Sequence, residues 1–430
     1  MKRKKKSMDN KSDWFLRKRR GFRVVLPVGQ QIPSCLHGPC LLFERKIDKN
    51  KKEKFFSCAV YRSHKCCSFR LNITGDIPRY HILDRSSIFK ACSRTYYYAA
   101  IRKKVNSLKA GNNEIFYCTT CNDVFTAPHI HVVKGPLKVA DIRKPSQLFS
   151  AYTQKSSESQ FWFSVESLLL LVNAIENFGT DGVLCIGTPT VFEYFQSQKI
   201  LRKNIKSFLL DIDARFAPFW RSSHFAVYSM MTNFFFDPKS LDKLIVFFKS
   251  VHHLVIICDP PFGVFIEVLM ESLKKLREQF FSTRMKDWND SWCKYIIVLP
   301  IFTGKRFLVG NEFHMLDYKI CYVNHSRYKR SEKSVVRIFT DLPLKAFDLS
   351  SYPEYKFCDK CDKFVAKSSS HCNLCHECPA EINMSKHCYE CGRCVRGTYR
   401  HCAKCSCCHL PRRCLEIQKI GCKSSIQLQK

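Results

Sequence analysis

The sequence has no uninterrupted apolar run of about 18 residues, which is the length that a membrane-spanning helix needs. Its basic start, MKRKKKSMDNK, also lacks the apolar core of a signal peptide. Both absences argue against a membrane-spanning or secreted protein. We therefore expect an intracellular protein with no membrane among its partners.

Acidic residues are few, with 37 Asp and Glu against 71 Lys and Arg, which gives a net charge of +34. A zinc ion held by three thiolates subtracts only about one charge per site, so the excess stays large. Each Lys or Arg that reaches a phosphate releases counterions, and this release favours binding to polyanions. Nucleic acid is therefore the expected partner, and an anionic membrane surface is the weaker alternative.

The 26 cysteines are unsuited to a disulfide framework, because disulfides are rare inside cells. They gather at both ends of the 430-residue chain, with eight at or before Cys121 and fourteen from Cys358 onward. Their CxxC spacing predicts zinc sites. Four others look like small core residues: Cys185, Cys258, Cys293 and Cys321. We expect a metal-poor catalytic centre between two metal-rich ends.

Residues 1–32 contain two basic clusters, KRKKK and RKRR. We expect a disordered basic tail, whose clusters serve nuclear targeting, phosphate contact or neither.

Residues 33–75 carry the segments HGPCLLF, FFSC and CSFRL. The ligands expected for one small zinc module are Cys35, His37, Cys58 and Cys67, with Cys40 and Cys66 as spare thiols. The module resembles a GRF zinc finger, a type that binds single-stranded nucleic acid. Its aromatic residues either stack on bases beside the lysines or form the small core.

Residues 112–135 predict a second finger, because YCTTCNDVFTAPHIHVV has the composition of a Cys2His2 site with shortened spacing. The candidate ligands are Cys118, Cys121, His129 and His131. The cysteine pair is the specific part of this pattern, and the choice of histidine stays open.

From residue 150 to residue 345, short apolar runs alternate with helical patterns, which predicts an α/β domain. A GxGxxG motif is absent, but the first apolar run enters a turn from Gly187 to Thr190, where Rossmann-like sheets meet their cofactor. Asp211 and Asp213 end the second run, where an acid can hydrogen-bond ribose hydroxyls. Strands are expected at 181–186, 205–213, 254–258, 294–300, 318–323 and 335–341. This layout is typical of a class I S-adenosylmethionine-dependent methyltransferase.

The sequence CDPPFG, residues 258–263, ends the apolar run LVIIC and precedes a helical pattern. Asp259 and the carbonyl of Pro260 can accept the two N–H hydrogens of an exocyclic amine, which aims its lone pair at a methyl donor. Pro261 stiffens the loop, and Phe262 can stack on an extruded base. The alternative is an ordinary turn in which Asp259 caps the next helix.

A polar, basic segment follows at residues 324–334, with the sequence NHSRYKRSEKS. A solvated hairpin loop is the simpler interpretation. A substrate gate is the alternative hypothesis.

Residues 355–422 repeat the unit His-Cys-x-x-Cys-x-x-Cys three times after FCDKC. The spacing permits interleaved sites in which one CxxC pair takes the His and the last Cys of the next unit. The sites expected are Cys358, Cys361, His371, Cys378; Cys372, Cys375, His387, Cys394; Cys388, Cys391, His401, Cys408; and Cys402, Cys405, Cys414, Cys422. Metal coordination would supply most of the folding energy here.

The order of a GRF-like finger, a Cys2His2-like finger, a DPPF domain and a DHHC-like tail resembles the CCHC-zinc-finger ribosomal-RNA adenine N6-methyltransferases. The resemblance covers about residues 33–422 and implies a Rossmann-like domain with zinc modules at both ends. It implies a target adenosine in large-subunit rRNA, structural zinc and nuclear or nucleolar localisation, with a cytoplasmic pool as an alternative. RNA-processing and helicase proteins are candidate partners. The implied S-adenosylmethionine contacts are Gln160, Phe161, Trp162, Phe163, Gly187, Thr190, Asp211, Asn233, Phe234 and Asp259.

Two departures from this family stand out. Only KSSIQLQK follows Cys422, so the family's C-terminal CCHC knuckle is missing, and Thr190 stands where a basic residue is expected. Two other functions remain open: a non-catalytic RNA-binding scaffold and a DNA adenine methyltransferase. A DHHC palmitoyltransferase is rejected, because Lys386 precedes His387-Cys388 in place of an acidic-histidine pair.

Overall fold

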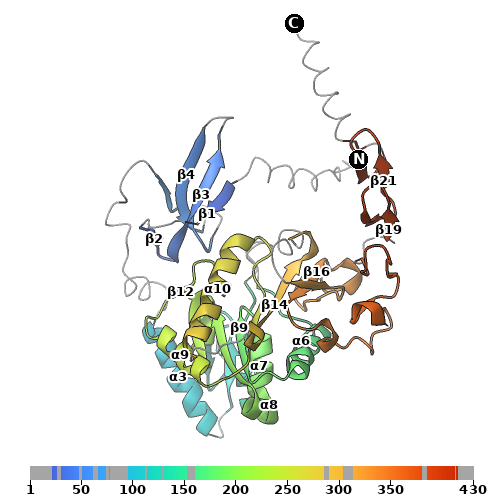
Figure 1. Ribbon diagram of the computed structural model, residues 1–430. Coiled ribbons are helices and arrows are strands. Elements are labelled where there is room, and N and C mark those ends of the chain that lie inside the picture. The colour runs from blue at the N-terminus through green and yellow to red at the C-terminus, as the bar shows by residue number, and fades with distance from the viewer. Residues whose placement is uncertain are drawn as a thin grey trace, which may run out of the picture. The chain divides into compact units, whose positions relative to one another are not determined.

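The computed structural model describes residues 22–26, 31–47, 51–61, 66–73, 77, 95–111, 114–127, 129–152, 160–284, 290–303, 313–379, 385–411 and 413–414. These residues fall into two compact units (Figure 1). The first comprises residues 1–162 and 180–297, and the second comprises 163–179 and 298–430.

An eight-stranded mixed sheet confirms the α/β class, with the order β12-β11-β10-β9-β13-β14-β16-β15. Neighbours among β9, β10, β11, β13 and β14 run parallel where they pair, and β12 and β15 pair antiparallel with β11 and β16. The bounds are β9 Gly182–Ile186, β10 Lys206–Asp211, β11 Phe225–Ser229, β12 Phe234–Phe235, β13 Leu254–Cys258, β14 Cys293–Pro300, β15 His314–Leu316 and β16 Val336–Thr340.

Helices alternate with the central strands, as the apolar periodicity predicts. Helix α6 begins after Ser164, whose hydroxyl accepts a hydrogen bond from the Ser167 amide, and it ends at Gly179 with φ of 77°. The helices of this region are α6 Val165–Phe178, α7 Pro189–Ser197, α8 Lys199–Asn204, α9 Ser240–Lys249 and α10 Ile266–Ser282. Short 3-10 turns are η2 Ala214–Phe216, η3 Asp290–Trp292, η4 Ser331–Lys333 and η5 Leu344–Ala346.

The strands read as continuous apolar runs because the sheet buries both of their faces. All five residues of β9 and all five of β13 are buried. The four central cysteines, Cys185, Cys258, Cys293 and Cys321, are buried as well, which confirms them as core residues.

The segment 318–323 is not a strand, contrary to expectation. The Cys321 amide donates to the Ser167 hydroxyl at 2.9 Å, and the Cys321 carbonyl accepts from the Ser164 amide at 2.8 Å. These bonds join the segment to the first turn of α6. Because the helix start uses these backbone groups, they do not extend a strand ladder.

The first finger is a small five-stranded sheet, in which β1-β3-β4-β5 are neighbours and β2 pairs with β3. Residues 22–25 of the expected disordered tail form β1, because Arg23 bonds Glu44 at 2.8 Å and Phe22 packs edge-on against Phe55. Residues 1–21 lie outside the described part of the chain. The bounds are β1 Phe22–Val25, β2 Ser34–Cys35, β3 Gly38–Lys46, β4 Lys52–Cys58 and β5 Arg70–Asn72.

Helix α3 (Thr95–Ala110) precedes the second finger, a three-stranded sheet with the order β7-β6-β8. Its strands and the two short helices after it are β6 Phe116–Cys118, β7 Asp123–Phe125, β8 Val133–Lys134, α4 Val139–Ile142 and α5 Pro145–Leu148.

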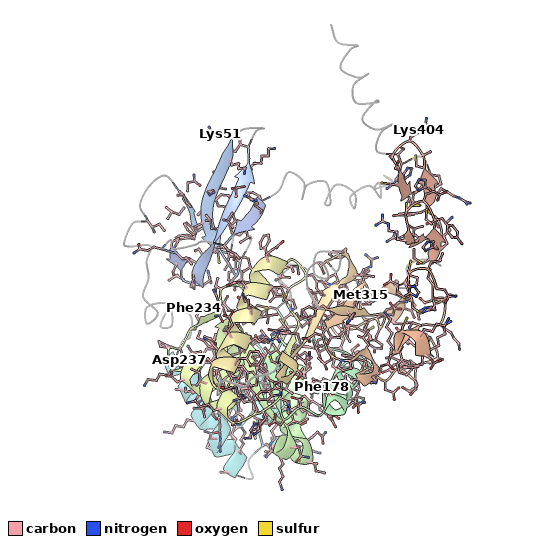
Figure 2. The ribbon with its side chains drawn as sticks, in the orientation of Figure 1. Lys51, Phe178, Phe234, Asp237, Met315 and Lys404 are labelled. Carbon is pink, nitrogen blue, oxygen red and sulfur yellow. The ribbon has the colours of Figure 1, made fainter. Side chains whose placement is uncertain are left out.

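The described residues of the cysteine-rich tail contain three two-stranded hairpins in series. They are β17 Tyr355–Cys358 with β18 Lys363–Ala366, β19 Ser385–Cys388 with β20 Arg393–Arg396, and β21 Arg400–Cys402 with β22 Cys407–His409; η6 spans Asp359–Cys361. Lys404 lies in the exposed turn of the last hairpin, and Lys51 lies exposed at the β3–β4 turn of the first finger (Figure 2).

Candidate active site and metal centres

The ends of three neighbouring strands meet at Gly187, directly after β9. Its amide donates to the Leu210 carbonyl at 2.9 Å, and its φ of 63° is one that residues with side chains rarely adopt. A Cβ here would lie 3.2 Å from the Asp259 carbonyl oxygen and 3.0 Å from the Met230 methyl. The Asp259 amide donates to the Ile186 carbonyl at 3.2 Å. The predicted turn and the acidic loop therefore lie side by side.

The Asp-Pro-Pro-Phe loop is held close to the sheet. Pro260 is buried, Asp259 and Phe262 are half-buried, and Pro261 is exposed. The next helix begins only at Ile266. Asp259 thus lies too far from the helix start to be its cap, although the loop does contain a turn, in which the Val264 amide donates to the Pro261 carbonyl at 2.8 Å.

Phe262 stacks on Phe161, with ring centroids 5.6 Å apart and an interplanar angle of 27°. The sequence predicted stacking of Phe262 on a base, and in the structure its ring partner comes from the predicted cofactor segment. Trp162 instead packs edge-on near Phe216, with centroids 6.4 Å apart. Phe161 is therefore the aromatic residue of this segment that reaches the acidic loop.

Phe163 belongs to the second unit and stacks on Tyr322, with centroids 5.4 Å apart. Both residues are buried, and they also form an isolated β-bridge. The Phe163 side chain is therefore a packing group.

A buried ion pair follows β10. The Arg215 guanidinium donates to the Asp213 carboxylate at 2.7 Å, and Gln160 bonds both partners at 3.2 Å. Asp213 is 3% exposed, and the Arg215 guanidinium lies over the Tyr152 ring at 4.0 Å. This network ties the predicted Gln160 contact to the end of β10. The sequence offered no signal for Arg215, since nothing in its neighbourhood marks a buried cation.

Asp211 ends β10, and its carboxylate accepts a hydrogen bond from the Asp213 amide at 2.8 Å. Burial raises the pKa of Asp211 to about 7, and the nearby Asp213 charge acts in the same direction. The group is therefore an acceptor whose ionisation changes near neutral pH. An acid in this state suits hydrogen bonding to hydroxyl groups.

Asn233 has φ of 48°, and its side-chain oxygen accepts from the Tyr228 hydroxyl at 2.9 Å. Phe234 is buried, and a Cβ on Gly38 of the first finger would lie 3.5 Å from its ring. The Phe234 side chain is thus a contact between finger and sheet. Thr190 lies in the first turn of α7, half-buried.

Five of the six predicted metal sets each come together, with ligand atoms within 4.8 Å of one another. They are Cys35, His37, Cys58, Cys67; Cys118, Cys121, His129, His131; Cys358, Cys361, His371, Cys378; Cys372, Cys375, His387, Cys394; and Cys388, Cys391, His401, Cys408. Cys422 of the sixth set lies outside the described residues.

Two aromatic residues of the first finger are buried, and one of them, Phe56, belongs to its core cluster. Phe56 is 1% exposed and Phe55 is 5% exposed. Phe43 stacks on Phe55, and the Arg70 guanidinium lies over the Phe55 ring, 3.9 Å from its centroid. Of the two interpretations that the sequence left open for these rings, the structure favours packing.

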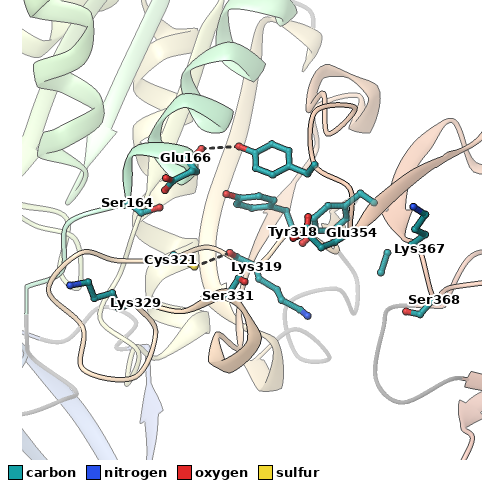
Figure 3. Close-up of a pocket in the computed structure, with 13 residues that line it drawn as sticks. Ser164, Glu166, Tyr318, Lys319, Cys321, Lys329, Ser331, Glu354, Lys367 and Ser368 are labelled. Atoms are coloured by element: carbon teal, nitrogen blue, oxygen red, sulfur yellow. Dashed lines mark hydrogen bonds between the residues drawn. The ribbon is translucent and has the colours of Figure 1, made fainter.

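A pocket of about 550 Å³ lies within the second unit (Figure 3). It lies between the first turn of α6 and the segments around Tyr318 and Tyr352, and the Tyr352 hydroxyl donates to the Glu166 carbonyl at 3.5 Å. Lys329 and Ser331, from the basic 324–334 segment, lie on its rim. None of the predicted cofactor or acidic-loop residues lines this pocket.

Comparison with known proteins gives a consistent set of relatives. A family described as probable N6-adenine methyltransferase matches residues 154–327. The rRNA N(6)-adenosine-methyltransferase ZCCHC4 of Homo sapiens is 30% identical over 384 residues, which cover 84% of this chain and 74% of the human protein. The protein of the same name from Xenopus tropicalis is 30% identical and covers 82% of this chain and 76% of its own length. Among the described residues, no helix has the length and apolar character needed to cross a membrane.

Proposed function

Because this chain belongs to the family of rRNA N(6)-adenosine-methyltransferases, we propose that it methylates N6 of an adenosine in ribosomal RNA, with S-adenosylmethionine as donor. The observation that carries the proposal is the direct contact between the Gly187 turn and the Asp259 backbone. This contact places a candidate cofactor turn beside a candidate amine-binding loop, at the carboxyl ends of parallel strands.

The residues present suit this cofactor. A Cβ at Gly187 would press on the Met230 methyl and on the Asp259 carbonyl, so glycine lets the proposed cofactor turn lie close to the acidic loop. Asp211 is an acceptor for ribose hydroxyls, and hydrogen bonds to the Asp213–Arg215 pair hold Gln160 beside the end of β10. The proposed set of S-adenosylmethionine contacts is completed by the backbone of residues 161–163 and by Thr190, Asn233 and Phe234. When bound, the cofactor supplies a methyl group on a positively charged sulfur.

The acidic loop performs the positioning. The Asp259 carboxylate and the Pro260 carbonyl accept the two hydrogens of the adenine amino group, which draws its lone pair out of the ring. The Pro260–Pro261 pair fixes the backbone, so these acceptors are in place before the substrate arrives. The Phe161–Phe262 ring pair supplies an aromatic surface for an unpaired or flipped base.

The metal sets are proposed to hold structural zinc. Each gathered set provides four thiol or imidazole ligands, which completes a tetrahedral site and leaves no position for a substrate. When bound, zinc cross-links segments that contain few apolar residues. The excess of basic residues then holds RNA through its phosphates.

The finer assignments rest on the resemblance to this family. We propose the large-subunit (28S-type) rRNA as the substrate, a nuclear or nucleolar location with a cytoplasmic pool, and RNA-processing or helicase proteins as partners. The basic clusters at the N-terminus are consistent with nuclear import.

A methyl-transfer assay tests the proposal. The purified chain, with isotope-labelled S-adenosylmethionine, is given rRNA fragments and DNA of the same sequence. We expect label in N6-methyladenosine from RNA only. Label in DNA alone would make the chain a DNA adenine methyltransferase, and no label together with no calorimetric donor binding would leave an RNA-binding scaffold.

A further inference from the structure

The last hairpin of the tail, β21–β22, has candidate metal ligands on both of its faces. His401 lies directly opposite Cys408, and Arg400 lies opposite His409. Side chains alternate between the two faces of a strand, so Cys402 and His409 share the face that His401 and Cys408 do not use. His401 and Cys408 belong to the third tail cluster, which consists of Cys388, Cys391, His401 and Cys408. The other face is therefore available for a further cluster.

The preceding hairpin, β19–β20, shows the same division of faces. His387 lies opposite Cys394, and both belong to the second tail cluster, which also contains Cys372 and Cys375. The neighbouring Cys388 belongs to the third tail cluster. The position that matches His409 is Val395, opposite Lys386. Cys388 shares its cluster with His401, the first histidine that follows it in the sequence. The first histidine that follows Cys402 is His409.

His409 has the arrangement of a metal-binding imidazole. Its Nδ1 lies 2.7 Å from the Leu410 carbonyl oxygen, to which it donates, so the lone pair is on Nε2. Nε2 is buried and has no hydrogen-bond partner in the described part of the chain. The thiols of Cys402 and Cys414 are the side chains that interact with this ring. A metal ion bound jointly by these thiols and the imidazole would provide a partner for the buried lone pair.

The sulfur spacing supports the same conclusion. Two thiolates on one tetrahedral zinc ion, each at about 2.3 Å from it, lie about 3.8 Å apart. The Cys402–Cys414 sulfur distance is 3.7 Å. The same 3.7 Å separates Cys391 from Cys408 in the third tail cluster. Cys402 and Cys414 are thus as close as a ligand pair in a neighbouring set.

We infer that the fourth metal site of the tail is a Cys3His zinc site formed by Cys402, Cys405, His409 and Cys414, with His409 binding through Nε2. His409 takes the place that the sequence pattern gave to Cys422. All four ligands lie within residues 402–414, so this site needs no ligand from another His-Cys unit. It does not depend on the proposed methyl transfer.

Two other thiols compete with His409 for this assignment. Cys407 lies opposite Cys402 in the hairpin but is exposed. Cys422 lies beyond the described residues. Both are matched controls, because Cys407→Ser and Cys422→Ser each remove one candidate ligand from the same tail.

Zinc content of the full chain, measured by native mass spectrometry with a chelator present, separates these candidates. We expect His409→Ala to hold one zinc ion fewer than the unmodified chain. Cys407→Ser and Cys422→Ser are expected to keep the full number. A full complement in His409→Ala, or the loss of one zinc ion in Cys422→Ser, would overturn the inference.

A second variant guards against general unfolding of the tail. His409→Cys restores four ligands, so we expect full metal content. With cobalt in place of zinc, the added thiolate should increase the sulfur-to-metal charge-transfer absorption over that of the unmodified chain. Unchanged absorption in His409→Cys would show that residue 409 does not bind the metal.

Discussion

At the scale of single residues, the buried acid Asp211 is the proposed acceptor for the ribose hydroxyls of the donor. Asp211 is 5% exposed, and its carboxylate accepts a hydrogen bond from the Asp213 amide. Burial raises its pKa to about 7, so the protonated form predominates in slightly acidic solution. In the ionised form both carboxylate oxygens accept hydrogen bonds, whereas in the protonated form one of them carries a proton and donates.

Donor affinity should therefore increase with pH through Asp211. Between pH 6 and pH 8 the ionised fraction of a group with a pKa near 7 rises on the order of tenfold. We expect calorimetry to show a similar increase in S-adenosylmethionine affinity, and Asp211→Asn to show a smaller one. The variant also corrects for titration of the donor itself. Equal pH dependence in both proteins would contradict this role.

The same pKa shift has an opposite effect on stability. An acid with a raised pKa in the folded state stabilises the fold below its unfolded pKa, and this contribution is lost as pH rises through about 7. The ligand-free Asp211→Asn variant should accordingly gain more in melting temperature at pH 8 than at pH 6.

Strand-end rules located Asp211, Gly187 and Asp259 from the sequence, because short apolar runs mark buried parallel strands. Arg215 could not be found in this way. Its guanidinium meets Gln160 and Asp213, and only the folded chain brings these residues together. His409 was missed for a related reason, since the repeat spacing pointed beyond it to Cys422.

At the scale of elements, the turn between β9 and α7 connects the proposed cofactor site with the proposed substrate loop. Gly187 touches the Asp259 loop through a close backbone approach, and its positive φ excludes most side chains. The turn is short, and α7 begins at Pro189. A change at Gly187 should therefore disturb the acidic loop as well as the turn.

Gly187→Ala should reduce methyl transfer by more than its effect on stability explains. The substitution costs about 1–2 kcal/mol for the left-handed backbone, and its methyl group presses on Asp259 at 3.2 Å. Gly179→Ala is the control, because Gly179 has φ of 77° but no atom within 4 Å of the added Cβ. Urea unfolding and donor binding are measured for both. Equal activity losses in the two variants would contradict the steric coupling.

The pattern of apolar runs predicted most elements of the central sheet but not all of them. Residues 318–323 are mostly apolar, as in a strand, yet the start of α6 uses the backbone groups of Cys321. Strand β1 was not predicted, because the basic residues around it resemble a disordered tail. In the structure its partner strand β3 supplies Glu44, which forms an ion pair with Arg23. In both places a tertiary contact decided the outcome against the local pattern.

At the scale of the whole molecule, the net charge of +34 and the cysteine-rich ends have separate roles. The positive charge is expected to attract RNA through its phosphates, and the metal sets are proposed to hold zinc that stabilises the small modules. The proposed donor site, in contrast, lies at the strand ends and would rely on buried hydrogen bonds. Binding of RNA and binding of the donor should therefore respond differently to salt.

RNA affinity should fall steeply as salt increases from 50 to 200 mM, on the order of a hundredfold or more if several phosphates are contacted. Donor affinity should change little over the same range. Fluorescence anisotropy with labelled RNA and calorimetry with S-adenosylmethionine measure the two quantities. A salt-insensitive RNA affinity would show that phosphate contacts are not the main attraction.

The most direct test of the account is mass spectrometry of nucleosides from rRNA treated with the unmodified chain and with Asp259→Ala, each saturated with S-adenosylmethionine. Calorimetry first establishes that both bind the donor. The account predicts N6-methyladenosine with the unmodified chain and a loss of at least about a hundredfold in the variant, since the amine loses its positioned acceptor. Undiminished N6-methyladenosine with Asp259→Ala would contradict it.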